Sequence, residues 1–300
     1  MQEIRSSETT RETLYIQFCF KQYIQYGSPS HKPNPDQNFL EWFIGFFEAK
    51  GEFLKWNDSN QNDRFGIEIT QKDEQLIQKI RSTLGFGLIA EISKNDQTYW
   101  RFYVQKLDNL KRIINLLNGN LITVKKRNQF TDWFNAFQKR HQTAISLLKS
   151  ERNISFKSAW LSGFFEGDAG FYVSKTKIVR MKKDGVEKFN IKMRFYLTQK
   201  DENLLFEEIR NLFKIPSKVY QISNSDSKEK YNRLDTYVLG CHILLRNYLT
   251  RYPFLGKRKI TLTRWNNLLN YRIFDYPVTP KSIEKVKRCI SGLTKDNFVV

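Results

Sequence analysis

The sequence predicts an α+β fold made of two similar halves, each with helices against one face of an antiparallel sheet. Three observations lead to this prediction: an internal repeat, helical patterns with buried faces, and strands in which apolar and polar residues alternate. Gly45-Phe-Phe-Glu recurs from Gly163, and the six residues from Ile69 recur from Leu197 with one change. The remaining matches, in the same order, are 103–104 with 237–238 and 125–127 with 257–259. The chain therefore contains two copies of one domain-sized unit.

Each half is expected to contain a helix, two strands, a helix, two strands and a helix, followed by one further helix. The first helix covers 38–49, where apolar residues surround almost the whole circumference, and its copy lies near 159–168. Alternation over 190–198 predicts a half-buried strand, matched by the strand that ends at 67–70. Asp73 and Asp201 are the predicted N-caps of helices over 74–84 and 202–213. The later elements are strands over 88–94, 98–105, 217–223 and 233–239, helices over 107–117 and 241–250, and last helices that begin near Phe130 and Ile260.

These elements divide the chain into two halves with an extension at each end. We expect an N-terminal extension over 1–36, a first half over 37–147, a second half over 148–276 and a C-terminal extension over 277–300. The extensions have no counterpart in the repeat.

Charge and composition indicate a folded protein and favour nucleic-acid binding over the alternative of a charged, solubilising surface. The 300 residues carry a formal net charge of +19, and 40 % of them are hydrophobic. Such a chain has too much apolar surface for a disordered basic tail, and its excess of cations favours a phosphate-rich partner. No apolar run is long enough for a bilayer span or a secretory signal, so we expect no membrane association. The scarcity of alanine beside abundant Lys, Asn, Ile and Phe suggests an A+T-rich coding genome, such as that of a mitochondrion or chloroplast.

The two repeated helices are expected to pack against each other. A helix that is apolar almost all round must be buried, and Gly45 and Gly163 leave room for close backbone approach. Packing the two copies together would create a pseudo-two-fold axis and bring Glu48 and Glu166 to one place. For these two acids a structural role at the helix ends is favoured over a catalytic one.

The two motifs resemble the signature motifs of a single-chain LAGLIDADG homing endonuclease. The resemblance rests on 45–51 and 163–169 and extends to the Thr-Gln-Lys strand ends and the basic runs before the last helices. It implies a monomer whose halves form one antiparallel β-saddle over the major groove of a double-stranded DNA target. It also implies cleavage of that target by metal-dependent phosphodiester hydrolysis, with Mg²⁺, Ca²⁺ or Mn²⁺ as the cofactor.

The resemblance also assigns site residues. Asp168 matches the metal-binding acid of the second motif, and Ala49 and Gly167, at the helix tips, are further metal-site positions. Gln71 and Gln199 match strand-end positions that orient water or metal. The basic residues expected near the cleavage site are Lys126 and Arg258.

Lys50 departs from the family pattern. It occupies the acid position of the first motif, where an ammonium cannot bind Mg²⁺ and would form an ion pair with Asp168. Three alternatives follow: an inactivated or engineered endonuclease, an enzyme that nicks one strand, or a protein that binds DNA or intron RNA without cutting, such as a maturase. We favour an endonuclease scaffold with impaired double-strand cleavage.

The polar faces of the strands are the predicted DNA-binding surface, because β-elements can enter the major groove. The candidate DNA-contacting residues are Leu54, Trp56, Glu68, Thr70, Arg101, Tyr172, Ser174, Lys192, Arg194, Tyr196, Gln221 and Arg233.

Overall fold

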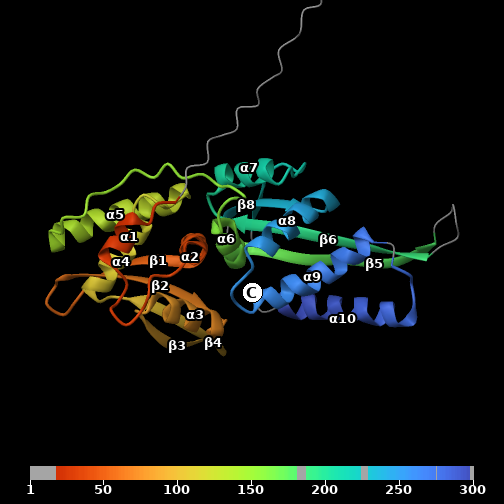
Figure 1. Ribbon diagram of the computed structural model, residues 1–300, viewed down its shortest axis with the longest axis horizontal. Helices are drawn as coiled ribbons and strands as arrows, with labels where there is room; N and C mark the ends of the chain where they lie inside the picture. Colours follow the sequence, from red (N-terminus) through yellow and green to blue (C-terminus); the bar gives the residue numbers. More distant parts are fainter. Residues whose placement is uncertain (1–17, 181–186, 224–228, 275, 298–300) are drawn as a thin grey trace, which may run out of the picture.

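The computed structural model describes residues 18–180, 187–223, 229–274 and 276–297, so 1–17 of the predicted N-terminal extension lie outside it. It contains two four-stranded antiparallel sheets with strand orders β1-β2-β4-β3 and β5-β6-β8-β7. The identical order in the two sheets confirms the α+β prediction and the repeat. The halves lie side by side and meet where α2 packs on α6 (Figure 1).

The elements of the two halves correspond one to one. The first half contains α2 (Gln37–Lys50), β1 (Gly51–Asn57), β2 (Asp63–Gln71), α3 (Glu74–Leu84), β3 (Leu88–Lys94), β4 (Gln97–Val104), α4 (Leu107–Leu117) and α5 (Val124–His141). The second half contains α6 (Trp160–Asp168), β5 (Ala169–Arg180), β6 (Glu187–Gln199), α7 (Asn203–Leu212), β7 (Tyr220–Ser223), β8 (Lys230–Thr236), α8 (Leu239–Arg251) and α9 (Arg258–Ile273). Two helices flank them, α1 (Lys21–Tyr26) and α10 (Pro280–Asn297).

Local sequence explains where several helices begin. Asp73 accepts a hydrogen bond from the Leu76 amide at 3.2 Å, which confirms the N-cap predicted for α3. Asp201 is not the matching cap. It has a φ of +62° and lies in the turn, whereas α7 begins after Glu202, whose side chain makes no capping bond. In the first half, α5 begins at Val124, ahead of the predicted start near Phe130, because the Thr123 side chain caps it.

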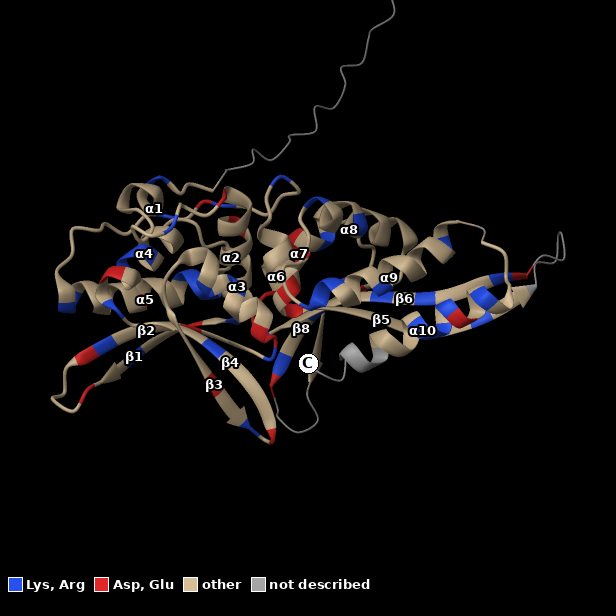
Figure 2. Ribbon diagram, turned by 60° about the horizontal axis from the view of Figure 1, so that its bottom comes forward, with Lys and Arg blue, Asp and Glu red and all other residues tan. Residues whose placement is uncertain are grey.

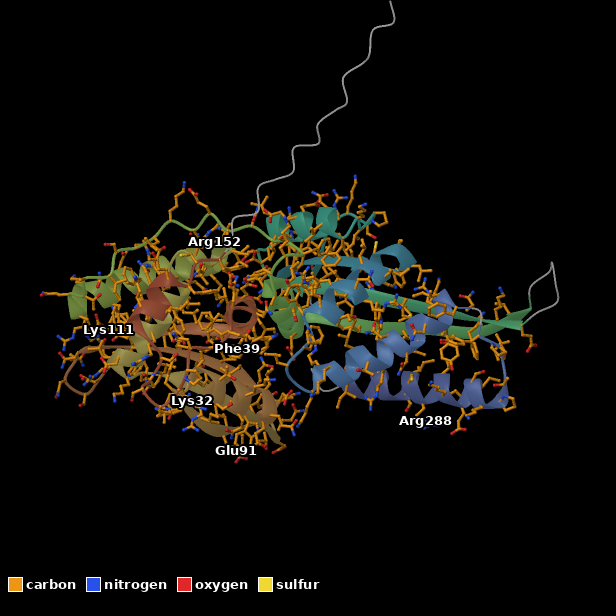
Figure 3. The ribbon with its side chains drawn as sticks, viewed as in Figure 1. Lys32, Phe39, Glu91, Lys111, Arg152 and Arg288 are labelled. Atoms are coloured by element: carbon orange, nitrogen blue, oxygen red, sulfur yellow. The ribbon has the colours of Figure 1, made fainter. Side chains whose placement is uncertain are left out.

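The core lies between the sheets and the helices. Figure 2 shows the helices of the first half gathered on one side of its strands, which leaves the other face of the sheet uncovered. Large aromatic side chains such as Trp42, Phe134 and Trp265 fill the interior. In Figure 3, Phe39 lies among packed side chains near the middle of the molecule, whereas Glu91 and Arg288 lie at its outer edge. None of the helices in the described part of the chain is long and apolar enough to cross a membrane.

Candidate functional site

The backbones of α2 and α6 touch at the seam between the halves. A Cβ atom added to Gly45 would overlap the carbonyl oxygen of Trp160, and one added to Gly163 would overlap that of Trp42. A Cβ added to Gly167 would overlap the methyl group of Ala49. The predicted packing of the two motif helices is therefore confirmed, and glycine is what permits it. The helices end side by side, so the residues at their tips share one site.

Lys50 and Asp168 form an ion pair at these tips. The Lys50 Nζ lies 2.8 Å from Asp168 Oδ1, and the two side chains are 32 % and 9 % exposed, respectively. The other carboxylate oxygen of Asp168, Oδ2, is buried and has no hydrogen-bond partner within the described ranges. Burial raises the pKa of Asp168, and the Lys50 ammonium acts in the opposite direction by favouring the charged form. The acid of the second motif is thus engaged by the lysine that replaces the acid of the first.

Lys126 and Arg258 bind the carboxyl ends of the two motif helices. Lys126 Nζ donates to the carbonyl oxygen of Gly51 at 2.5 Å, and Arg258 donates to those of Glu166, at 2.5 Å, and Ala169. Gly51 and Ala169 each follow the last residue of their helix, so the two cations occupy equivalent places. Cations are favourable there because the last carbonyl groups of a helix lack partners and carry its negative dipole end.

These two cations lie close enough to Asp168 to favour its charged form. Burial lowers the pKa of Lys126 and also that of Arg258, and neighbouring acids partly oppose the effect. Three cationic side chains, those of Lys50, Lys126 and Arg258, therefore surround one carboxylate.

Glu48 and Glu166 tie the two halves together by a crossed pair of contacts. Glu48 accepts hydrogen bonds from Trp160 Nε1 in the opposite half at 2.5 Å, and from the Ile122 and Thr123 amides at 2.9 and 2.7 Å. Burial raises the pKa of Glu48 to about 7. This carboxylate therefore joins the opposite motif helix to the segment that leads into α5.

Glu166 repeats the arrangement from the other side. It accepts from Trp42 Nε1 at 2.9 Å, and from the Leu255 and Gly256 amides at 2.8 and 2.7 Å. Each acid thus accepts three hydrogen bonds, which is the arrangement expected for the structural role favoured for them. The tryptophans were not predicted as their partners, although each stands three residues before the repeated glycine of its motif, which was a usable signal.

An open groove of about 910 Å³ lies beside the helix tips in the first half. Lys50, Glu52, Thr70, Lys126 and Gln199 are among the residues that line it, so the structure brings Gln199 from the second half to this site. Gln71 is not among the lining residues.

The donor set at the seam does not fit a pair of divalent cations. Such ions prefer oxygen ligands, and two-metal hydrolysis needs carboxylates beside both of them. The described residues contain no group of three or more His, Cys, Asp or Glu side chains able to hold a metal. At the predicted metal-site positions Asp168, Ala49 and Gly167, the one carboxylate is already bound to an ammonium.

In the first sheet, the candidate DNA-contacting residues lie on the face away from the helices. Between β1 and β2, Leu54 pairs with Gly66 and Glu52 pairs with Glu68. Between β2 and β4, Glu68 pairs with Tyr103 and Thr70 pairs with Arg101. This register puts Leu54, Trp56, Glu68, Thr70 and Arg101 on one face.

The second sheet repeats the pattern, with one exception. Thr198 pairs with Arg233 as Thr70 pairs with Arg101, so the two arginines are equivalent. Gln221 pairs with Asn232 and lies on the opposite, helix-facing side, so the expectation of a shared face is wrong for Gln221. The preceding residue of β7, Tyr220, pairs with Arg233 and lies on the outward face instead. The residues that keep the outward face are Tyr172, Lys192, Arg194, Tyr196 and Arg233. Ser174 lies at a register shift of β5, and its side chain is outside the described residues.

The outward arginines of the second sheet are held by aromatic and acidic neighbours. The guanidinium of Arg233 lies 4.4 Å from the ring centroid of Tyr196, and that of Arg194 lies 5.7 Å from the same ring. Arg194 also forms an ion pair with Asp235, which accepts a hydrogen bond from the Tyr220 hydroxyl at 3.0 Å. Sequence reasoning did not find Asp235 or Tyr220, because their role depends on strand register.

Known proteins resemble this chain over most of its length. A family model described as LAGLIDADG endonuclease matches residues 43–137 and 161–269. The "Probable intron-encoded endonuclease 4" of Neurospora crassa is 26 % identical over 263 residues, which are 87 % of this chain and 45 % of that protein. The "Intron-encoded RNA maturase bI4" of Saccharomyces cerevisiae is 25 % identical over 252 residues, which are 79 % of this chain and 36 % of that protein. This chain thus spans less than half the length of either relative.

The fold matches solved structures as well. The LAGLIDADG homing endonuclease I-LtrWI bound to target DNA aligns with a TM-score of 0.64 at 18 % identity, over 85 % of this chain and 97 % of that one. Since the family model covers both halves, each with its motif helix at the seam, this chain belongs to the LAGLIDADG endonuclease family.

Proposed function

We propose that this chain binds a long double-stranded DNA target site-specifically and that Lys50 impairs its cleavage of both strands. The observation that carries the proposal is the 2.8 Å ion pair between Lys50 and Asp168 at the seam. LAGLIDADG endonucleases use divalent cations such as Mg²⁺, whereas the side chains at this seam do not fit a pair of them. In this chain the ammonium of Lys50 competes for the carboxylate that such an ion would need. Cleavage of one strand through the half-site of Asp168 is the alternative, and nicked plasmid in the test below would identify it.

The outward strand faces are the proposed DNA-contacting surface. They carry Arg101 and Arg233 at equivalent positions of the two sheets, and arginine recognises guanine with paired hydrogen bonds. Lys192 adds a further cation on the second sheet, where Arg194 is paired with Asp235. A net charge of +19 supplies the sequence-independent part of the affinity. Binding as a monomer follows from the two halves in one chain, and the intron-encoded relatives favour an organellar gene.

The second candidate function is that of an intron RNA maturase. The match to a yeast protein named as an RNA maturase supports it, and a non-cleaving role would need no acid at position 50. Preference for intron RNA over duplex DNA in a salt titration would identify this function.

Plasmid cleavage tests the proposal. A supercoiled plasmid that carries the uninterrupted intron-insertion site is incubated with Mg²⁺ and the wild-type chain or Lys50→Glu. We expect the wild-type chain to leave supercoiled or nicked plasmid and Lys50→Glu to produce linear DNA. Lys55→Glu is the matched control, because it makes the same charge change in the same groove without contact to Asp168. Linear product from the wild-type chain at the rate of Lys50→Glu would refute the impairment.

A further inference from the structure

The three cations at the seam differ in burial and in how many protein groups they already contact. Lys126 and Arg258 are buried or half-buried and bind main-chain carbonyl groups of the motif-helix ends. Lys50 has a partly exposed side chain that lines the open groove. An ammonium has three N–H donors, and within the described ranges its acceptor is a single oxygen, Asp168 Oδ1. Lys50 is thus the seam cation best able to contact a further anion.

The charge on Asp168 would otherwise oppose DNA at this place. Two like charges a few ångströms apart repel strongly where water is excluded, and Asp168 is 9 % exposed. An acid at this position therefore needs a cation before a phosphate group can approach it. The ion pair provides that cation as part of the chain, at a fixed distance from the carboxylate.

The groove beside Lys50 is mixed in charge, so the effect is local. Lys55, Lys125 and Lys126 line it together with Glu52, Glu68 and Asp132. Lys55 is paired with Asp63 at 3.1 Å, and Glu68 lies 3.5 Å from Arg101. None of these contacts neutralises Asp168. The cations that do so are those at the helix tips, Lys50, Lys126 and Arg258.

We propose that Lys50 replaces the divalent cation in DNA binding: it neutralises Asp168 and donates to a backbone phosphate at the centre of the target, so that binding is independent of divalent cations. This inference rests on the proposed DNA-binding function and concerns the phosphate contact at the seam. It goes beyond impaired cleavage, because it assigns the lysine a positive role in affinity.

The test compares dissociation constants with and without a divalent cation. The probe is a fluorescent duplex enriched by the wild-type chain from a random library in CaCl₂, and anisotropy is then measured in EDTA and in CaCl₂ at equal ionic strength. The variants are Lys50→Glu and the neutral Lys50→Met, with Lys55→Glu as control. Circular dichroism melting establishes that each variant is folded.

We expect the wild-type dissociation constant to be the same in EDTA and CaCl₂. Lys50→Glu should bind about tenfold more weakly in EDTA and recover most of that loss with Ca²⁺, the size expected for one charge contact. Lys50→Met should reduce the slope of log affinity against log salt by about 0.9, as for the loss of one phosphate contact. Lys55→Glu should give the same value in both buffers.

Either of two results would overturn the inference. One is a wild-type affinity that improves about tenfold with Ca²⁺; the other is a Lys50→Met variant with the wild-type affinity and salt slope in EDTA. Failure of the wild-type chain to enrich any duplex would instead refute the proposed DNA-binding function, so the two failures are distinguishable.

Discussion

Replacing Gly45 with alanine should push the two motif helices apart. The added methyl group would overlap the Trp160 carbonyl oxygen, and the next nearest atoms are the Trp160 carbonyl carbon and the Phe164 amide nitrogen. All three are main-chain atoms, so no side-chain rotation can relieve the overlap, and α2 and α6 must move relative to each other.

The expected loss combines two opposing terms. Alanine is favoured over glycine in a helix by about 0.5–1 kcal/mol, whereas overpacking a well-packed core costs about 1–3 kcal/mol and occasionally more. Because these main-chain atoms cannot move aside independently, we expect the upper part of that range and, after the gain in helix propensity, a net loss of about 1–2.5 kcal/mol in the free energy of unfolding. Out of a total of about 5–15 kcal/mol for a typical domain, this is a large change.

Equilibrium unfolding in urea measures this loss. Gly240→Ala is the matched control, because Gly240 also lies in a helix, α8, and an added Cβ has no neighbour within 4 Å. We expect the control to be as stable as the wild type or more stable. The double variant Gly45→Ala/Gly163→Ala should lose less than the sum of the single losses, because one separation of the helices relieves both overlaps. A Gly45→Ala variant as stable as Gly240→Ala would refute the reasoning.

Three further predictions concern the crossed contacts and the strand face. The pKa of Glu48 is about 7 in the folded protein and 4.5, its ordinary value, in the unfolded chain. Between these pH values the folded protein binds the proton and the unfolded chain does not. The free energy of unfolding should therefore fall as the pH rises from 4.5 to about 7. Urea unfolding at several pH values should show a smaller decline in Glu48→Gln, and equal slopes would contradict the raised pKa. Trp160→Phe removes one buried donor to Glu48 and should cost about 1 kcal/mol in the same assay, more than Trp56→Phe on the exposed strand face. Arg101→Ala and Arg233→Ala should each relax base preference in one half of the selected target, at a cost of about 1–3 kcal/mol for the preferred base; unchanged selection profiles would remove these arginines from base recognition.

The sequence predicted features that depend on local pattern or on repetition. The pairing of Lys126 with Arg258 came from aligning the two halves, and both side chains do bind equivalent helix ends. The contact between Lys50 and Asp168 followed from placing both helix tips at one seam. In each case the repeat supplied spatial information that a single copy would not have contained.

Features that depend on register or on turn geometry could not be predicted in this way. Gln221 was misplaced because a shift of one residue moves a strand side chain to the other face, and the pattern of this short strand does not fix its phase. Asp201 failed as an N-cap because the repeated Lys-Asp-Glu sequence adopts a different turn in the second half, with a left-handed residue before α7. Identical residues thus take different roles where the surrounding loop differs.

The crossed bonds of Glu48 with Trp160 and of Glu166 with Trp42 bear on how such proteins can be recombined. In each half, the indole N–H of the tryptophan donates a hydrogen bond to the glutamate of the other half. Each half therefore depends on the other for one acceptor and one donor. A half expressed alone would expose both groups, and a hybrid with a half lacking either one would bury an unmatched polar atom. Chimeras built from this chain should therefore be assembled with partner halves that keep both the tryptophan and the glutamate.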